Sequence, residues 1–266
     1  MNETNLFESR WRWRQLLICN LIALAILASW LWPPARQIWD WLDLAAFHAL
    51  NAPLATQKWW AYLGAVGNMR YADLASALVA LFALMKRGWI LDSARLRNAF
   101  YGFFALLLLL FLIRVGLVRE LLKIIDWERE SPSRVIDGAV RLTQMFPGWD
   151  ERWYLKDSSN SCFPGDHAAV LMLWALFLWP VATAGNCLLI AVLAAIFMAP
   201  RLVSGAHWLT DDLIGGIALS LVAIGFGRYT PYAARVVPWL QRMGDPVLGF
   251  IGRMPGLGGL RLISGR

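Results

Sequence analysis

The chain has 266 residues, of which 59% are hydrophobic and 16% are charged, and its mean hydropathy is +0.50. This composition is typical of a polytopic membrane protein. The net charge of +7 is explained by basic residues that set membrane topology and face lipid headgroups, so it does not call for a nucleic-acid partner. The three cysteines form no CxxC pair, so neither a structural disulfide nor a zinc site is predicted.

Six apolar stretches approach the ~20 residues that a membrane-spanning helix needs. They cover residues 15–32, 72–85, 99–118, 167–181, 188–199 and 213–226. No small-residue cleavage site follows the first stretch, so we interpret it as a retained anchor. We predict an all-α fold with a six-span membrane domain at residues 1–230 and a cytoplasmic tail at 231–266, with a short amphipathic helix near 236–243. Aromatic and charged residues at helical spacing in 39–67 predict interfacial helices in an outer loop.

Clusters of basic residues predict the orientation. They precede the first span, join the second to the third, and follow the sixth: Arg10, Arg12 and Arg14; Lys86, Arg87, Arg95 and Arg97; Arg228, Arg235, Arg242 and Arg253. With six spans these clusters share one side, which the positive-inside rule makes the cytoplasm. Both termini are then cytoplasmic, and the loops at 32–71, 119–166 and 200–210 face outward. Cys162 in the second of these loops should therefore react with a membrane-impermeant thiol reagent.

Two motifs at the edges of apolar stretches predict phosphate chemistry. The first contains Arg201, His207 and Asp211 at the spacing R-x5-H-x3-D, and the second ends the string Phe163-Pro164-Gly165-Asp166-His167. His207 and Asp211 are four residues apart, so on a helix they share a face and Asp211 can orient the imidazole for attack on phosphorus. His167 is the candidate general acid.

Several further groups are candidates for binding the phosphate. Arg201 presents a planar guanidinium, and the backbone at Gly165 and Asp166 opens a helix N-terminus that suits an anion. Arg129 and Lys123 add positive charge from the outer loop, although charges there also pair locally. Because these groups neutralise a phosphate, we expect no metal or other cofactor.

Other ionisable residues have open or structural interpretations. We interpret His48 as structural. Arg114 falls inside the third predicted span and either snorkels or faces the interior. Asp73 is a possible partner of Arg114 or of Arg70, and the sequence does not decide between them.

The order of these motifs resembles the type 2 phosphatidic acid phosphatase superfamily, whose signatures are written KxxxxxxRP, PSGH and SRxxxxxHxxxD. The third signature fits except that Pro200 replaces Ser, and the second reads Pro164-Gly165-Asp166-His167. In the first, Arg129 is followed by Glu130-Ser131-Pro132, and Lys123 lies one residue closer to Arg129 than the signature has it.

These departures resemble one branch of the superfamily, the lipid A 1-diphosphate synthases of Gram-negative bacteria, with FPGDH, Arg-x-Ser-Pro and PR-x3-GAHW-x-TD signatures. The matching residues are 163–167, 129–132 and 200–211. The resemblance implies a six-span inner-membrane enzyme that moves a phosphate from undecaprenyl diphosphate to the 1-phosphate of lipid A on the periplasmic face. It also implies a phosphohistidine on His207, an acid–base role for His167, and no metal.

Two alternatives remain open. The motif residues also suit a phosphatase acting on undecaprenyl diphosphate or another lipid phosphate, since only the attacking group differs. A transporter or proton relay would use Arg114, Asp73, His207 and Asp211 to line a path through the bilayer. The transporter is less favoured because the ionisable residues cluster at one membrane edge.

Overall fold

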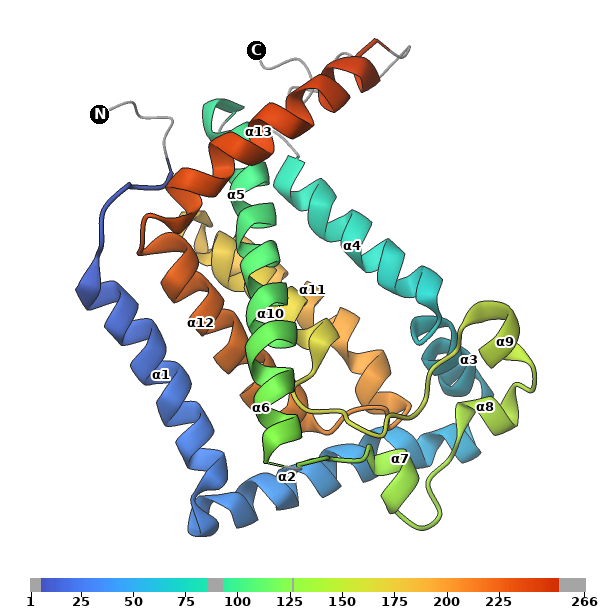
Figure 1. Cartoon of the computed structure of the whole chain (residues 1–266). Helices are drawn as coiled ribbons and strands as arrows, with labels where there is room; N and C mark the ends of the chain where they lie inside the picture. The colour runs from blue at the N-terminus through green and yellow to red at the C-terminus, as the bar shows by residue number, and fades with distance from the viewer. Residues whose placement is uncertain (1–5, 86–92, 126, 254–266) are drawn as a thin grey trace.

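A computed structural model describes residues 6–85, 93–125 and 127–253 (Figure 1). All regular secondary structure in these residues is helical, which confirms the predicted all-α class. The first half contains α1 (Trp13–Leu31), α2 (Pro33–Asn51), η1 (Ala52–Ala55), α3 (Lys58–Gly67), α4 (Arg70–Met85), α5 (Ser93–Leu112), the π-helix η2 (Ile113–Val118) and α6 (Arg119–Ile124). The second half contains α7 (Pro132–Val135), α8 (Leu142–Met145), α9 (Trp149–Trp153), α10 (Asp166–Leu178), η3 (Trp179–Val181), α11 (Ala184–Val203), the π-helix η4 (Asp211–Gly216), α12 (Ile217–Arg228) and α13 (Tyr232–Ile251).

Three helices in the described residues are long and apolar enough to cross a membrane: Trp13–Leu31, Leu96–Ile124 and Ala184–Val203. A fourth is added if Asp211–Arg228 and Tyr232–Ile251, which meet at 82°, form one broken span. The helix Asp166–Val181 is apolar but shorter. The protein is therefore a membrane protein. All six predicted stretches are helical, but their number as spans stays a prediction.

The helical bundle is built around α12, which packs against α1, α5 and α10 (Figure 1). Its core contains the fully buried side chains of Leu106, Leu173 and Trp174. By contrast, α1 exposes Leu17 and Leu24 on its outer face. Apolar side chains on an outer face are stable where lipid replaces water, so this pattern fits a bundle surrounded by acyl chains.

A second layer closes one end of the bundle. Figure 1 shows α2 crossing this end at a large angle to α1, with α3 and the short helices α7 to α9 beside it. Asn51 at the end of α2 donates to the carbonyls of Val140 and Val203 and accepts from the amide of Val140. The buried side-chain amide of Asn51 thus joins α2, the segment between α7 and α8, and α11. The helices predicted for 39–67 are confirmed, and their position at the membrane interface stays a prediction.

Both described ends of the chain lie at the opposite end of the bundle from this layer (Figure 1). The predicted basic clusters near Arg12 and Arg228 lie at that end, and the Arg12 amide bonds to the carbonyl of Tyr229. Lys86 and Arg87 lie outside the described residues. The helix α13 is longer than the predicted 236–243 segment, and it packs on α5 through a hydrogen bond from Tyr101 to Asp245.

The third predicted span is longer than the sequence indicated. Its helix continues from α5 through η2 into α6 as a 29-residue unit, Leu96–Ile124. At 1.5 Å per residue it measures about 43 Å, more than the ~30 Å hydrocarbon core. The expectation that an irregular outer loop begins at Arg119 is therefore wrong.

The expectation that Cys162 is open to a thiol reagent is also contradicted. Its side chain is buried, and Sγ donates to the backbone carbonyl of Arg129. Burial and the nearby Asp211 carboxylate raise the pKa of the Cys162 thiol. The thiolate is the reactive form of cysteine. Burial and the raised pKa therefore both lower the reactivity of Cys162 toward a thiol reagent.

Exposed engineered cysteines test the orientation instead. On a background with Cys19→Ser and Cys187→Ser, we expect Asp150→Cys on α9 to react with an impermeant maleimide in intact spheroplasts, and Arg242→Cys on α13 to react only after membrane rupture. Cys162, retained in every variant, should react only after denaturation. The reverse order of labelling for the two engineered positions would overturn the orientation.

Candidate active site

His207 and Asp211 meet at the beginning of the sixth apolar segment. The imidazole Nδ1 lies 3.5 Å from Asp211 Oδ2, longer than a normal hydrogen bond, and Nδ1 has no other partner among the described residues. Such contacts are often long in substrate-free enzymes and shorten when substrate binds. Because Nδ1 faces the carboxylate, Nε2 is directed away from it. The two side chains are adjacent as predicted, but His207 precedes the helix that begins at Leu209, so the expectation that they share a helical face is wrong.

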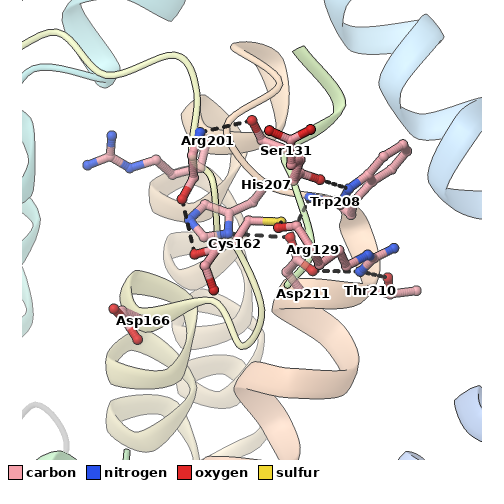
Figure 2. A network of polar contacts seen from close by, with 12 residues as sticks. Arg129, Ser131, Cys162, Asp166, Arg201, His207, Trp208, Thr210 and Asp211 are labelled. Atoms are coloured by element: carbon pink, nitrogen blue, oxygen red, sulfur yellow. Dashed lines mark hydrogen bonds and ion pairs between the residues drawn. The ribbon is translucent and has the colours of Figure 1, made fainter. Parts of the chain in front are cut away.

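Asp211 is fully buried and accepts hydrogen bonds from two donors. Arg129 donates to Oδ1 at 2.6 Å, and the backbone amide of Trp208 donates to Oδ2 at 2.8 Å (Figure 2). An unpaired buried carboxylate would cost several kcal/mol, so Arg129 is what permits an ionised Asp211 at this depth.

Arg129 also binds a second buried carboxylate, that of Asp43 on α2. Its guanidinium donates to Asp43 Oδ2 at 2.7 Å and to Thr210 Oγ1 at 2.8 Å. Thr210 in turn donates to Asp43 from both its amide and its hydroxyl. Burial raises the pKa of the Asp43 carboxyl, although Thr210 and Arg129 act in the opposite direction. Indole rings of Trp30 and Trp208 lie 5.2 Å and 5.1 Å from the guanidinium carbon, which suits a cation.

A second cluster contains His167, Arg201 and Asp73. Arg201 donates to both oxygens of Asp73 at 2.9 and 2.7 Å, and to Asn68 Oδ1 at 3.3 Å. His167 Nδ1 lies 3.7 Å from Asp73, and its Nε2 lies 3.0 Å from the carbonyl of Phe197. Asp73 therefore pairs with Arg201, and neither of the partners considered from the sequence was correct.

The two clusters belong to one site. His167 interacts electrostatically with Asp73, Arg201 and His207. The amide of His207 also bonds to the carbonyl of Arg201, at 3.3 Å, across the turn that ends α11. This turn contains Gly205 at φ +71°, where an added Cβ would lie 2.8 Å from Phe47 and 3.2 Å from the backbone of Ser133. Only glycine fits this confined, left-handed position.

Gly165 precedes the first residue of α10 and packs directly against the other motif. Its amide donates to the carbonyl of Asp211 at 3.1 Å, so that amide is not free for phosphate. An added Cβ would lie 2.6 Å from Asp212 Oδ1, which explains the glycine. The next three amides, from Asp166 onward, have no intrahelical acceptor, an arrangement that suits an anion at a helix N-terminus.

The side chains of Lys123 and Asp166 are not brought to the histidines, although the prediction for Asp166 concerned its backbone amide. Asp166 is exposed and pairs with Arg114, and Figure 2 shows it apart from Asp211 and Arg129. Lys123 pairs with Glu120 at 2.7 Å on the exposed side of α6. His48 is exposed on α2 and stays outside the site. Within the described ranges, no group of three or more His, Cys, Asp or Glu side chains is placed to hold a metal ion.

Sequence reasoning missed two carboxylates of the site, Asp43 and Asp212. Asp43 shares the buried face of α2 with Phe47 and Asn51, at i, i+4 and i+8. An acidic residue in register with a buried aromatic was therefore an available signal. Asp212 is buried beside Asp211, and its Oδ2 has no hydrogen-bond partner among the described residues. In the sequence, only its position next to the Arg201–Asp211 motif pointed to a place in the site.

Comparison with known proteins agrees with this geometry. The PAP2 superfamily matches residues 103–235, half of the chain, including both histidines, Arg201 and Asp211. This chain belongs to the PAP2 superfamily. The lipid A 1-diphosphate synthase of Escherichia coli K12 is 27% identical over 230 residues, which cover 86% of this chain and 92% of that protein. No solved structure matches the chain. The family and this relative support a lipid phosphatase or phosphotransferase.

A pair of substitutions on α2 tests the role of Asp43. We expect Asp43→Asn to lower the free energy of unfolding by about 3 kcal/mol, because it leaves Arg129 only partly compensated in a buried position. Asp40→Asn is the matched control: Asp40 pairs with Arg36 at the surface, so its loss should cost less than about 1 kcal/mol. Denaturant titration in detergent measures both, and equal effects would contradict the proposed dependence on Asp43.

Proposed function

We propose that this protein is a lipid phosphotransferase of the bacterial inner membrane that moves a phosphate from undecaprenyl diphosphate to the 1-phosphate of lipid A. The observation that carries the proposal is the buried His207–Asp211 pair joined to the Arg201–Asp73–His167 cluster. The name of the Escherichia coli relative supports lipid A as acceptor. We place the site on the periplasmic face of a six-span fold with both termini in the cytoplasm.

The first step transfers the terminal phosphoryl group to His207. Nε2 attacks the terminal phosphorus of undecaprenyl diphosphate, an N–P bond forms, and the P–O bond to undecaprenyl phosphate breaks. Asp211 accepts a hydrogen bond from Nδ1–H, which keeps its proton, and the carboxylate stabilises the positive charge that develops on the imidazole. The buried Arg129 contact keeps Asp211 ionised for this role.

His167 handles the proton in both steps. It gives a proton to the departing oxygen of undecaprenyl phosphate, and it takes one back when the 1-phosphate oxygen of lipid A attacks the phosphohistidine. Its Nδ1 faces Asp73 at 3.7 Å, so Asp73 supports the protonated ring. The Phe197 carbonyl accepts from Nε2, which fixes the ring orientation and leaves Nδ1, beyond hydrogen-bond distance of Asp73, as the nitrogen that exchanges the proton.

The transferring phosphoryl group is neutralised by Arg201 and by the first amides of α10. Arg201 is held by Asp73 through one terminal nitrogen, which leaves other N–H donors of the fork for phosphate oxygens. Phosphoryl transfer depends mainly on positioning and charge neutralisation, so these groups account for catalysis without a cofactor.

Transfer and hydrolysis differ only in what attacks the phosphohistidine. The side chains of His207 and Arg201 are 12% and 11% exposed, and Asp211 is fully buried. A site this enclosed limits the entry of water and favours capture by a bound lipid phosphate. A lipid phosphate phosphatase with the same histidines is the alternative.

Substitutions at the nucleophile test the phosphohistidine. With labelled undecaprenyl diphosphate, His207→Ala should form no phosphoenzyme and show no turnover, since no other group replaces the nucleophile. Asp211→Asn should lose ~10²-fold or more through the wrong tautomer. His48→Ala, an exposed histidine outside the site, is the control and should behave like the wild-type protein. A folded His207→Ala protein with near-normal turnover would exclude the phosphohistidine mechanism.

The fate of the label tests the acceptor. Adding lipid A should divert most label from inorganic phosphate to a lipid that carries one more phosphate, because the phosphoenzyme is captured before water reaches it. The same partition is expected in excess EDTA, because Arg201 and backbone amides neutralise the phosphate. Release of phosphate that saturating lipid A does not change, without a labelled lipid, would assign the protein as a phosphatase.

A further inference from the structure

A basic groove lies beside the start of α10, away from the two histidines. Three cations line it, on one helical unit: Arg114, Arg119 and Lys123. Arg114 and Arg119 are five residues apart across the π-helix η2, whose hydrogen bonds link residues at that spacing, so both side chains lie on one side. Lys123 follows four residues later in α6 and continues the row. The cavity has a volume of about 500 Å³.

The cations of this groove are available to a ligand. Among the described residues Lys123 pairs only with Glu120, and both side chains are more than half exposed, so this surface ion pair is weak and exchangeable. Arg119 is exposed and forms no ion pair within the described part of the chain. Arg114 is mostly buried and pairs with the exposed Asp166. Three cations face two acidic side chains, Glu128 and Asp166, in the lining, so the groove favours an anion.

An apolar groove adjoins the basic groove on the side of the bundle core. Its volume is about 770 Å³, and its lining includes Phe104, Phe111, Leu219 and Trp239. It shares Arg114, Val115 and Asp166 with the basic groove. A cationic pocket that opens into a large apolar channel matches a phosphorylated headgroup with attached acyl chains.

The histidine cluster has lipid-facing cavities of its own. Two apolar cavities of about 430 and 350 Å³ are lined by Asp73, Ser76 and His167. Asp166 and His167 are the first two residues of α10, and they line different sets of cavities. The first turn of α10 therefore stands between two lipid-sized spaces, as a transferase with two lipid substrates requires.

We propose that the basic groove of Arg114, Arg119 and Lys123 binds a phosphate of the acceptor lipid, with its acyl chains in the adjoining apolar groove. This assignment rests on the proposed transferase function. The acceptor is assigned here because lipid A carries several acyl chains and two phosphates, which suit the larger apolar space and the row of cations. A single-chain prenyl phosphate suits the smaller cavities at His167.

Equilibrium binding provides a test that does not need turnover. In His207→Ala protein in phosphatidylcholine nanodiscs, Arg119→Gln with Lys123→Gln should weaken binding of labelled lipid A about tenfold or more, since two charge-assisted contacts are lost. Binding of undecaprenyl phosphate should change by less than about twofold, the effect of two distant, screened charges. The charge-matched control is Lys58→Gln with Arg152→Gln, two exposed positions outside the grooves, and it should leave both affinities unchanged.

Competition with inorganic phosphate separates a lipid site from a simple anion site. Millimolar phosphate should displace little lipid A, because it lacks the acyl chains that fill the apolar groove. Displacement at concentrations comparable to those of lipid A would overturn the assignment to a lipid. The assignment would also be overturned if the groove variant, Arg119→Gln with Lys123→Gln, bound lipid A with unchanged affinity. It would be overturned as well if this variant lost affinity for undecaprenyl phosphate alone.

Product analysis distinguishes failure of this inference from failure of the proposed function. In otherwise wild-type protein, we expect the groove variant to raise KM for lipid A more than it lowers kcat, because it affects acceptor binding. A wild-type protein that makes no phosphorylated lipid A would refute the transferase function. A wild-type protein that makes this product, with a groove variant of unchanged acceptor KM, would refute only the groove.

Discussion

The site depends on one buried ion pair, between Arg129 and the carboxylate of Asp211. Asp211 is inaccessible to solvent, and a carboxylate at that depth stays ionised only if strong donors surround it. Arg129 is itself buried, so it needs a second carboxylate, which Asp43 supplies from α2. The two ion pairs of Arg129 thus hold three parts of the chain together: the segment that contains Arg129, helix α2, and the start of the sixth apolar segment. Asp211, held in place by these ion pairs, faces Nδ1 of His207 and orients its ring.

The two histidines are supported by separate carboxylates from separate helices. Asp211 faces His207, whereas Asp73 on α4 faces His167 and holds Arg201. A nucleophile and an acid–base group need different proton affinities, and separate partners let the fold tune each one independently. Arg201 is joined to both halves, by its side chain to Asp73 and by its carbonyl to the His207 amide. Its position in the last turn of α11 makes that double contact possible.

The cavities beside the two sides of α10 are also separate, and in the proposed function each would hold one of the two lipid substrates. The first turn of α10 presents Asp166 to the basic and apolar grooves and His167 to the cavities beside Asp73. Consecutive residues on a helix point in different directions, so one turn can border two spaces. The extension of the third apolar helix through η2 and α6 carries the row of cations along the basic groove. In the proposed function, both features place charged groups beside the spaces assigned to the two lipid phosphates.

The sequence alone determined the all-α membrane class and the helical stretches, because hydropathy and helical periodicity are local properties. It also indicated that His207 and Asp211 are adjacent, although His207 precedes the helix and the contact does not come from helical spacing. The motif order also indicated the family that residues 103–235 match. Only the tertiary structure decided that Asp73 pairs with Arg201 and that Asp43 balances Arg129, contacts between residues 128 and 86 positions apart. It likewise decided that Cys162 is buried and that Lys123 lies away from the histidines. These features depend on which helix faces pack together. A local sequence pattern cannot predict the ion-pair partner of a residue when burial and charge select that partner from a distant helix.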